Sequence, residues 1–390
     1  MISHHSLLTS LQDSKRRIKT VETEGGNMNK RNKKNSLLMG ALIMLGCLPS
    51  GLLIGMIGYR ADIDVFPIYL LFLLSMGIAL ILQTAVHEAG HMVFGLLTGF
   101  RFLSYRVLSL IISKEDGKLK LGRFSIPGTV GQCLMGTPVN TEKKPYYLYN
   151  AGGLIFNLIF MVFNYLIVFL SRNPYLAIFA AANGMYDLIM LIGNGIPFDG
   201  NGIANDGKNI QEMNRHPEAI DTFYSMLDIN EMMMNGTRAR DTSDDMIDLR
   251  ETTLHTGSIG TSNLVWKENK LMDEHRFSEA EELMMQIRSN DYPLLDYHQK
   301  MLMLDQKYID CLNGCFEDIT DRKTLNYLQG TRKNVLSVIR YFYVRALYLK
   351  DEKELEKSRQ ALESLEKDYP FQGEYQTEKE LIEIAEEKLG

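Results

Sequence analysis

Four long apolar stretches constrain the fold of this chain more than any other feature of its sequence. They cover residues 36–59, 66–100, 146–171 and 175–198. A helix needs about 20 apolar residues to cross the hydrocarbon core of a bilayer, which is about 30 Å thick. Inside that core every backbone N–H and C=O has to be paired within the protein, so only helices and closed barrels can cross it. We therefore expect a mainly α protein that contains a bundle of about four membrane helices.

The charge of the chain is divided between its two halves. From Gln211 onward the sequence contains 36 acidic and 23 basic residues, a net charge of −13, whereas the whole chain of 390 residues carries −6. The first half, which holds all four apolar stretches, is therefore basic, and the second half is acidic. A nucleic-acid-binding domain needs a basic surface to contact phosphates, so the acidic half argues against this class of function.

The positions of Lys and Arg predict how the chain lies in the membrane. These residues concentrate before the first apolar stretch and between the second and third, while the two other connections contain only Arg60 and Arg172. Cytoplasmic loops carry an excess of positive charge. We therefore expect a multi-pass protein of a bacterial cytoplasmic membrane, with both termini in the cytoplasm. Residues 1–35 form a polar and basic leader, expected to be disordered, in which Met28 is an alternative start.

The segment 100–139, between the second and third apolar stretches, has a different pattern. Apolar and polar residues alternate in RFLSYRVLSLII and again in KLKLGRFSI, and residues 114–118 between these runs are typical of a turn. The pattern predicts a small β-hairpin, closed by Pro127 and Gly128. Its edge could pair with an unwound substrate strand, or the hairpin could simply link two helices at the membrane surface.

Residues 87–91 have the sequence HEAGH and lie within the second apolar stretch, where Glu88 is the only acidic or basic residue besides the histidines. Ionisable side chains are costly in a hydrocarbon environment, which indicates a functional reason for their presence. On a helix, His87 and His91 are four residues apart and share a face, so both imidazoles can bind one Zn²⁺. Glu88 can then act as the general base toward an attacking water. The motif predicts a metalloprotease whose catalytic centre lies within the membrane, near the cytoplasmic side.

Two histidines leave a zinc site incomplete, so a third ligand has to come from another part of the chain. The segment NGIPFDGNGIANDGK, after the fourth apolar stretch, provides two candidates, Asp199 and Asp206. Each is followed by glycine and lies beyond the break that Pro197 makes in a helix. Asp187 is a third candidate, because it is an ionisable residue inside the fourth apolar stretch.

HEAGH within a membrane span, the downstream run GGLIFN, and NGIP followed by Asp-Gly together resemble the site-2 protease family of zinc intramembrane proteases. The resemblance covers roughly residues 36–210, and it implies a transmembrane metalloprotease domain over that range. By this resemblance His87 and His91 are zinc ligands and Glu88 is the catalytic base. The family's third ligand is an aspartate before glycine, which favours Asp206, in a longer loop that ends in Asn-Asp-Gly, over the alternative Asp199.

The resemblance also implies a substrate-binding element in the third apolar stretch. In the family, an asparagine on the corresponding helix lies near the substrate, after a glycine-proline pair. Asn157 matches that asparagine, and Gly153 precedes it at the motif's glycine. Leu154 stands at the proline position, which should leave the helix more regular than in the family.

The acidic half is expected to be helical. Residues 211–261 read as a linker with one helix, and residues 262–390 as an all-α cytosolic domain. The run SNLVWKENKLMDEHRFSEAEELMMQIRSN at 262–290 resembles a tetratricopeptide helix pair, and residues 335–369 provide a second candidate pair. Such an array would present a concave face to a peptide or a cytosolic protein partner, or would form a helical cap that stabilises the enzyme.

Together these features predict a zinc endopeptidase that cleaves a membrane-anchored protein or peptide precursor in or near its transmembrane segment. Cleavage of this kind serves regulated intramembrane proteolysis, or removes signal-peptide remnants and matures peptide pheromones. The alternative is a membrane-tethered helical scaffold that binds a partner protein and has a non-catalytic metal site. The complete HEAGH motif favours the enzyme, and the irregular spacing of the Asp-Gly pairs favours the scaffold.

Overall fold

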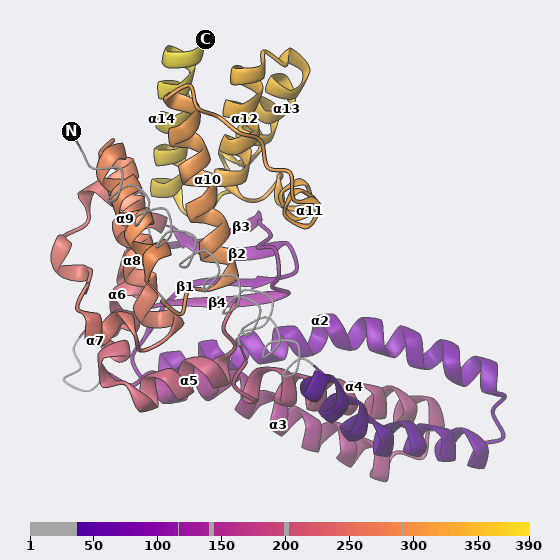
Figure 1. Ribbon diagram of the computed structural model, residues 1–390. Helices are drawn as coiled ribbons and strands as arrows, with labels where there is room; N and C mark the ends of the chain where they lie inside the picture. The colour runs from indigo at the N-terminus through magenta and orange to yellow at the C-terminus, as the bar shows by residue number, and fades with distance from the viewer. Residues whose placement is uncertain (1–36, 116, 140–143, 199–202, 291) are drawn as a thin grey trace, which may run out of the picture.

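The computed structural model describes residues 37–115, 117–139, 144–198, 203–290 and 292–390. The leader 1–35, expected to be disordered, lies outside the described residues. Four described helices are long and apolar enough to cross a membrane, and they are Leu37–Arg60, α2 (Val65–Leu97), α3 (Tyr146–Leu170) and α4 (Pro174–Gly195). They correspond to the four expected stretches, and they lie side by side at one end of the molecule (Figure 1).

Two of these helices end earlier than their apolar stretches, for reasons that the local sequence contains. After α2 the backbone of Gly99 has a φ of +92°, and the N–H of Phe100 donates to the carbonyl of Gly95 at 3.0 Å. This left-handed glycine closes the helix end. The helix α4 ends at Gly195 because Pro197 disfavours helical backbone at the residue before it.

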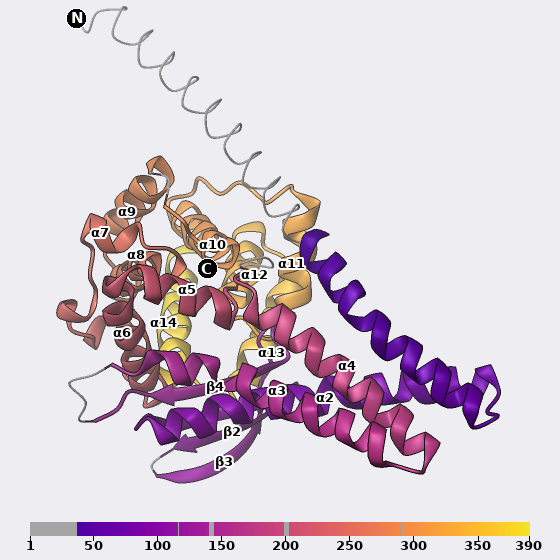
Figure 2. The ribbon, with the colours of Figure 1, turned by 90° about the horizontal axis from the view of Figure 1, so that it is seen from below.

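Glycines set the contact between α2 and α3. A Cβ at Gly90 would meet the carbonyl oxygen of Gly152, and a Cβ at Gly152 would meet the carbonyl oxygen of Gly90. The two helices therefore touch backbone to backbone, which only glycine at both positions allows. Seen from below, α3 runs beside α2 and α4 (Figure 2).

The segment between α2 and α3 forms a four-stranded antiparallel sheet rather than the expected hairpin. Its strands are β1 (Arg101–Val107), β2 (Leu110–Glu115), β3 (Lys118–Arg123) and β4 (Gly131–Gly136), in the order β3-β2-β1-β4. The predicted turn at 114–118 joins β2 to β3. The expected single strand over 101–112 is divided, because Leu108 adopts a φ of +53° and turns the chain. The strand β4 escaped prediction because it is short and bounded by glycines.

The sheet lies between the membrane helices and the C-terminal helices (Figure 1). On the α2 side, the hydroxyl of Tyr105 donates to the carbonyl of Ala85 at 2.6 Å. On the other side, Ile111 and Phe124 are buried against α12 (Leu336–Leu349), α13 (Glu352–Leu365) and α14 (Gln372–Leu389). The sheet thus joins the two halves of the chain into one packed structure.

All described elements after the sheet and α4 are helical. They are α5 (Asp206–Arg215), α6 (Pro217–Met234), the 3₁₀ turns η2 (Ala239–Asp241) and η3 (Asp244–Met246), α7 (Glu251–Leu254), α8 (Ser258–Asp273), α9 (Phe277–Ser289), α10 (Asp296–Leu312), α11 (Arg322–Thr331), α12 (Leu336–Leu349), α13 (Glu352–Leu365) and α14 (Gln372–Leu389). The two expected helix pairs correspond to α8–α9 and α12–α13, while their assignment to a tetratricopeptide array stays a prediction. The segment 211–261 packs more tightly than a linker, because Phe223 and Leu227 of α6 share a core with β4.

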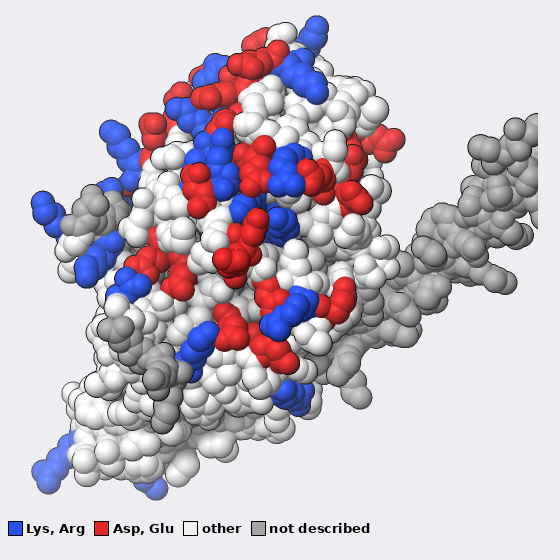
Figure 3. Space-filling model, turned by 90° about the vertical axis from the view of Figure 1, so that its left-hand side faces the viewer, with Lys and Arg blue, Asp and Glu red and all other residues white. Residues whose placement is uncertain are grey.

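Charged side chains are distributed unevenly over the surface. On the face seen in Figure 3, Asp, Glu, Lys and Arg gather over the C-terminal helices and are sparse on the lowest part of the molecule. The membrane helices instead expose many large apolar side chains, among them Phe66, Leu74 and Phe163. This division matches the basic, apolar half and the acidic, polar half of the sequence.

Candidate metal centre

The two histidines of HEAGH point at one place on the buried face of α2. His87 is 4% exposed and His91 is 8% exposed, and their Nε2 atoms are 3.2 Å apart. The carboxylate oxygen Oδ2 of Asp206 lies 3.1 Å from His87 Nε2 and 3.4 Å from His91 Nε2. The structure therefore brings Asp206, the favoured third ligand, to the two predicted ligands.

The position of Asp206 follows from its neighbours in the sequence. Asn205 caps α5, since its Oδ1 accepts from the N–H of Lys208 at 2.9 Å, and its Nδ2 donates to the carbonyls of Gly193 and Ile196 at 2.7 Å each. The start of α5 is thereby fixed to the end of α4. Gly207 allows the close approach, because a Cβ there would meet the carbonyl oxygen of Gly195. Asn-Asp-Gly thus positions the carboxylate with one residue on each side.

Both imidazoles are oriented by hydrogen bonds at Nδ1, the ring nitrogen opposite the one that faces Asp206. His87 Nδ1 lies 2.6 Å from Oδ1 of Asn157, and His91 Nδ1 lies 2.8 Å from the carbonyl oxygen of Tyr149. Both partners are acceptors, so each Nδ1–H donates and each Nε2 keeps its lone pair for a metal ion. Asn157 is completely buried, which makes it a positioning residue for His87. Its contact with substrate stays a prediction.

Asp187 supports the site instead of joining it. Its carboxylate accepts from Nδ2 of Asn157 at 3.1 Å and from Nδ2 of Asn164 at 3.0 Å, and the residue is completely buried. A chain of hydrogen bonds therefore runs from Asp187 through Asn157 to His87. Asp199, the other alternative ligand, lies outside the described residues.

Gly153 packs directly against His87, one of the candidate metal ligands. A Cβ at this position would lie 2.5 Å from Cε1 and 2.7 Å from Nε2 of His87. The glycine therefore makes room for the imidazole on the α3 side. The structure places Gly153 behind His87, and its predicted contact with substrate stays a prediction.

Glu88, the candidate base, lies beside the edge strand of the sheet. It is 9% exposed, and its carboxylate makes no hydrogen bond with any residue that the structure describes. A Cβ at Gly131, the first residue of β4, would lie 2.5 Å from Glu88 Oε1. Arg106 holds this start of the strand, because Nη2 donates to the carbonyl of Gly131 at 3.2 Å. Glu88 is thus close to the strand edge and free to exchange a proton.

These residues line a cavity of about 500 Å³. His87, Glu88, His91 and Asp206 form one wall, and residues 128–133 of β4 and the preceding turn form another. The cavity is therefore bounded on one side by ionisable groups and on another by the backbone of a strand edge.

Burial alone would raise the pKa of Asp206, but the neighbouring His91 and His87 hold it below its ordinary range. Oδ2 of Asp206 has no hydrogen-bond partner among the described residues. Within that part of the chain, His87, His91 and Asp206 form the only group of three or more possible ligands that could hold a metal ion, with ligand atoms within 4.8 Å of one another.

Sequence reasoning missed the residues around Glu88. Gly131, Arg106 and Tyr149 belong to the site only because of how the sheet and α3 pack on α2. The closely spaced glycines of PGTVGQ were the one signal for a backbone that approaches another group. Comparison of the chain with protein-family models, with curated proteins and with solved structures finds no match in any of the three.

Proposed function

We propose that this protein is a zinc endopeptidase that cleaves a membrane-anchored protein or peptide precursor in or beside a transmembrane segment. One observation carries the proposal: three possible ligand atoms from two helices converge beside a buried glutamate, where the apolar helix α2 packs against β4. Every member of this group was expected from HEAGH and from Asn-Asp-Gly. Apolar helices around the site give access to a substrate that is itself in the membrane.

The donor set fits zinc. Zinc binds histidine nitrogen and carboxylate oxygen at about 2.0–2.2 Å, so the ligand atoms of a tetrahedral site lie about 3.3–3.6 Å apart. The three separations among His87, His91 and Asp206 are 3.1, 3.2 and 3.4 Å, so one lies in this range and the other two fall about 0.1–0.2 Å short of it. Three protein ligands leave one position open, which is the arrangement of catalytic zinc sites. When bound, the ion would polarise the scissile carbonyl and make water a stronger nucleophile.

The protein's own groups carry the proton transfers. Glu88 is the cavity carboxylate that is not one of the three candidate ligands, so it can take the proton from the attacking water and pass it to the leaving amine. The Nδ1–H groups of His87 and His91 stay on Asn157 and on the Tyr149 carbonyl throughout. These contacts keep both rings oriented while charge develops in the cavity.

The edge strand β4 supports a way of holding the substrate. Peptide bonds inside a helix are inaccessible, so the scissile segment has to unwind before cleavage. β4 is an outer strand of the sheet, and its first residues, Gly131 to Cys133, line the cavity beside Glu88. We infer that the unwound substrate pairs with this edge, which would place a peptide bond next to the base.

The test is zinc content and cleavage of a single-span model substrate by the purified protein in detergent. Wild type should hold zinc and cleave, and Glu88→Gln should keep zinc but lose cleavage about 100-fold or more. Asp206→Asn should lose both. Asp221→Asn, which changes an exposed aspartate paired with Lys144, serves as the matched control and should behave as wild type.

Two results would contradict the proposal. If Glu88→Gln cleaved as fast as wild type, Glu88 would not be the base, and if wild type held no zinc, the metal centre would be wrong. A protein that bound zinc and a cytosolic partner but cleaved no membrane substrate would instead be the membrane-tethered scaffold.

A further inference from the structure

A second cavity lies among the C-terminal helices, separate from the metal centre. It has a volume of about 400 Å³, and its walls come from α6, α8, α10, α12, α14 and the edge strand β4. This volume lies within the range of roughly 300–1,000 Å³ that is usual for binding sites of small ligands. Methionine and aromatic side chains line it together with buried charged groups.

One buried guanidinium occupies this cavity, and it is already engaged by two carboxylates. Arg340 is 1% exposed, its Nε donates to Glu378 at 2.5 Å, and its Nη2 donates to Asp305. The single positive charge of Arg340 is therefore shared between the negative charges of Glu378 and Asp305. Nη1 has no hydrogen-bond partner among the described residues. One strong donor thus remains available to a carbonyl oxygen.

Two further carboxyl groups form no ion pair with any described cation. Glu268 is completely buried, and neither of its oxygens has a hydrogen-bond partner among the described residues. It lies behind the wall of the cavity, because it shares the face of α8 with the lining residues Val265 and Met272 without being one of them. Burial, followed by the charge of Asp305, raises the pKa of Glu268 well above its ordinary range. Glu374 lines the same cavity, and burial raises its pKa to about 7.

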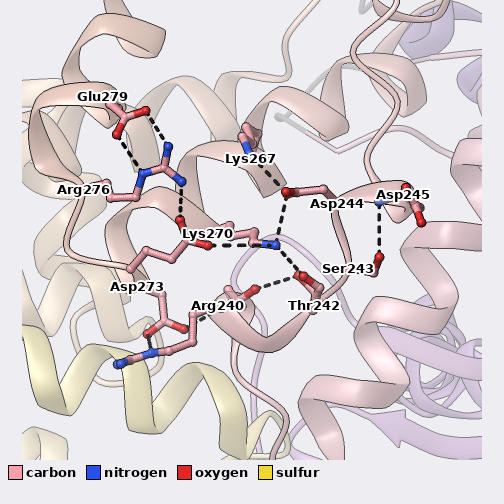
Figure 4. Close-up of polar contacts among 12 residues, drawn as sticks. Arg240, Thr242, Ser243, Asp244, Asp245, Lys267, Lys270, Asp273, Arg276 and Glu279 are labelled. Atoms are coloured by element: carbon pink, nitrogen blue, oxygen red, sulfur yellow. Dashed lines mark hydrogen bonds and ion pairs between the residues drawn. The ribbon is translucent and has the colours of Figure 1, made fainter.

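Other carboxylates around α8 are paired with cations of the chain (Figure 4). Asp244 lies 3.0 Å from Nζ of Lys270 and 3.3 Å from Nζ of Lys267, and Asp273 lies 3.3 Å from Nε of Arg240. Burying a carboxyl group without a partner costs free energy, so a natural core rarely contains one. Glu374, which lines the cavity, is therefore the group that can receive a cation from outside this chain, and the charge of Glu268 lies behind it.

The cavity suits an organic cation better than a metal ion. The carboxylates around it do not bring three ligand atoms together, since the described residues do so only at His87, His91 and Asp206. Trp266 and Tyr297 offer aromatic faces, and methionines offer flexible apolar contacts. A Lys or Arg side chain has an apolar stem for such walls and a cationic head for the carboxylates.

The side chain of Gln132 connects the two cavities, because it lines both. Gln132 follows Gly131, which packs against Glu88, on the edge strand β4. A peptide that pairs along a strand advances about 3.3 Å per residue. A substrate held at β4 can therefore have its scissile bond at Glu88 and, a few residues away, a side chain in the acidic cavity.

We propose that this acidic cavity binds a Lys or Arg side chain of a peptide segment that flanks the cleaved bond, and so selects substrates with a basic flank. The proposal rests on the proposed proteolytic function. The same charge rule that predicts a cytoplasmic helical domain gives membrane proteins basic flanks on that side, so such a residue is within reach in most membrane-anchored substrates. Arg340 Nη1 then binds a carbonyl oxygen of the segment.

Binding is tested first without catalysis, in the full-length Glu88→Gln variant in detergent. The probe is a short fluorescent peptide of Ser and Ala that carries a pair of Lys residues, compared with the same peptide carrying Gln instead. We expect the Lys peptide to bind at least about tenfold more tightly than the Gln peptide, and Glu268→Gln to remove this preference. Glu383→Gln, an exposed residue of α14, is the matched control and should preserve it.

Glu268→Gln breaks no ion pair, so it should fold, and its unfolding temperature is compared with that of the Glu383→Gln control. Glu374→Gln provides a second, independent change in the same cavity. The proposal would be overturned if the Glu88→Gln protein, whose acidic cavity is unchanged, bound the Lys and Gln peptides equally. It would also be overturned if folded Glu268→Gln and Glu374→Gln kept the full preference for the Lys peptide.

Cleavage then identifies the source of the basic segment. For active protein, kcat/KM for a substrate with a basic flank relative to a neutral one should fall about tenfold in Glu268→Gln, through KM. If a free Lys peptide instead accelerates cleavage of the neutral substrate, the cavity still binds the cation, and its natural ligand is a separate basic peptide. A protein that prefers the Lys peptide but never cleaves would keep this cavity site and lose the proteolytic function.

Discussion

Replacement of Gly153 by alanine tests the geometry of the metal centre directly. The added Cβ would lie 2.5–2.7 Å from three atoms of the His87 ring. Atoms in ordinary contact are about 3.5–4.0 Å apart, so the ring has to move by about 1 Å. His87 is held on the same side by a 2.6 Å hydrogen bond to Asn157, and a retreat of α2 from α3 would open the backbone contact between Gly90 and Gly152.

A displacement of about 1 Å is large for a metal ligand. Zinc–nitrogen distances tolerate deviations of about 0.2 Å, so His87 cannot stay in an intact site after such a shift. Loss of orientation of a ligand costs about 10–100-fold in metal affinity, and loss of the ligand itself costs more. We therefore expect Gly153→Ala to weaken zinc binding about 100-fold, which corresponds to about 2.7 kcal/mol.

Zinc affinity is measured by competition with a chromogenic chelator on purified protein in detergent, and folding is followed by thermal unfolding. Gly77→Ala is the matched control, because it adds a methyl to α2 where nothing lies within 4 Å. It should bind zinc as wild type does. If Gly153→Ala folds and keeps wild-type zinc affinity, then either His87 is not a ligand or α3 does not pack on it as described.

Three further predictions follow from contacts around the two cavities. Asn157→Leu leaves His87 Nδ1–H and Asp187 without their shared partner, so zinc affinity measured by chelator competition should fall about 10–100-fold. An unchanged affinity would show that Asn157 does not position His87. Gly131→Ala should displace Glu88 but leave His87, His91 and Asp206 in place. Zinc content should therefore stay as in wild type, while the rate of substrate cleavage falls at least tenfold. Equal loss of zinc and of cleavage would show that the substitution also disturbs the ligands. Burial raises the pKa of Glu374 from about 4.5 to about 7; a hydrogen bond from Tyr369 opposes this rise and the charge of Glu378 adds to it. The folded state therefore binds this proton more tightly than the unfolded state does. The free energy of unfolding consequently falls as pH rises from about 5 to 8. Glu374→Gln should flatten this loss, by at most about 3 kcal/mol, in chemical unfolding at several pH values, and parallel curves would refute the assignment.

Much of the metal centre could be predicted because its signals are local. The spacing of His87 and His91 places both on one helix face wherever that helix lies. Asp206 is favoured over Asp199 through the family resemblance, and the structure shows that Asn205 and Gly207 beside it serve as a helix cap and a close-approach residue. Asp187 ranks below both loop aspartates on sequence grounds, but its supporting role needed the structure, since the sequence of α4 does not say that this face meets Asn157 and Asn164.

The sheet was predicted less well, for a physical reason. A hairpin is signalled by alternation on both sides of a turn, and β2 and β3 show it. β4 instead owes its strand conformation to pairing with β1 and to burial of Leu134 and Met135, which are tertiary effects. The acidic cavity had no sequence signal at all, because Glu268, Asp305 and Arg340 come from three separate helices.

The position of the sheet between the two halves also has a consequence for how the protein is made. The strands β1 to β4 pair within a short segment that is synthesised early, but the face that carries Ile111 and Phe124 is covered mainly by residues of the later segment from α12 to α14, Tyr369 included. During synthesis this face stays open until the last helices leave the ribosome. The strand edge beside Glu88 therefore acquires its final support only after α12, α13 and α14 have been synthesised.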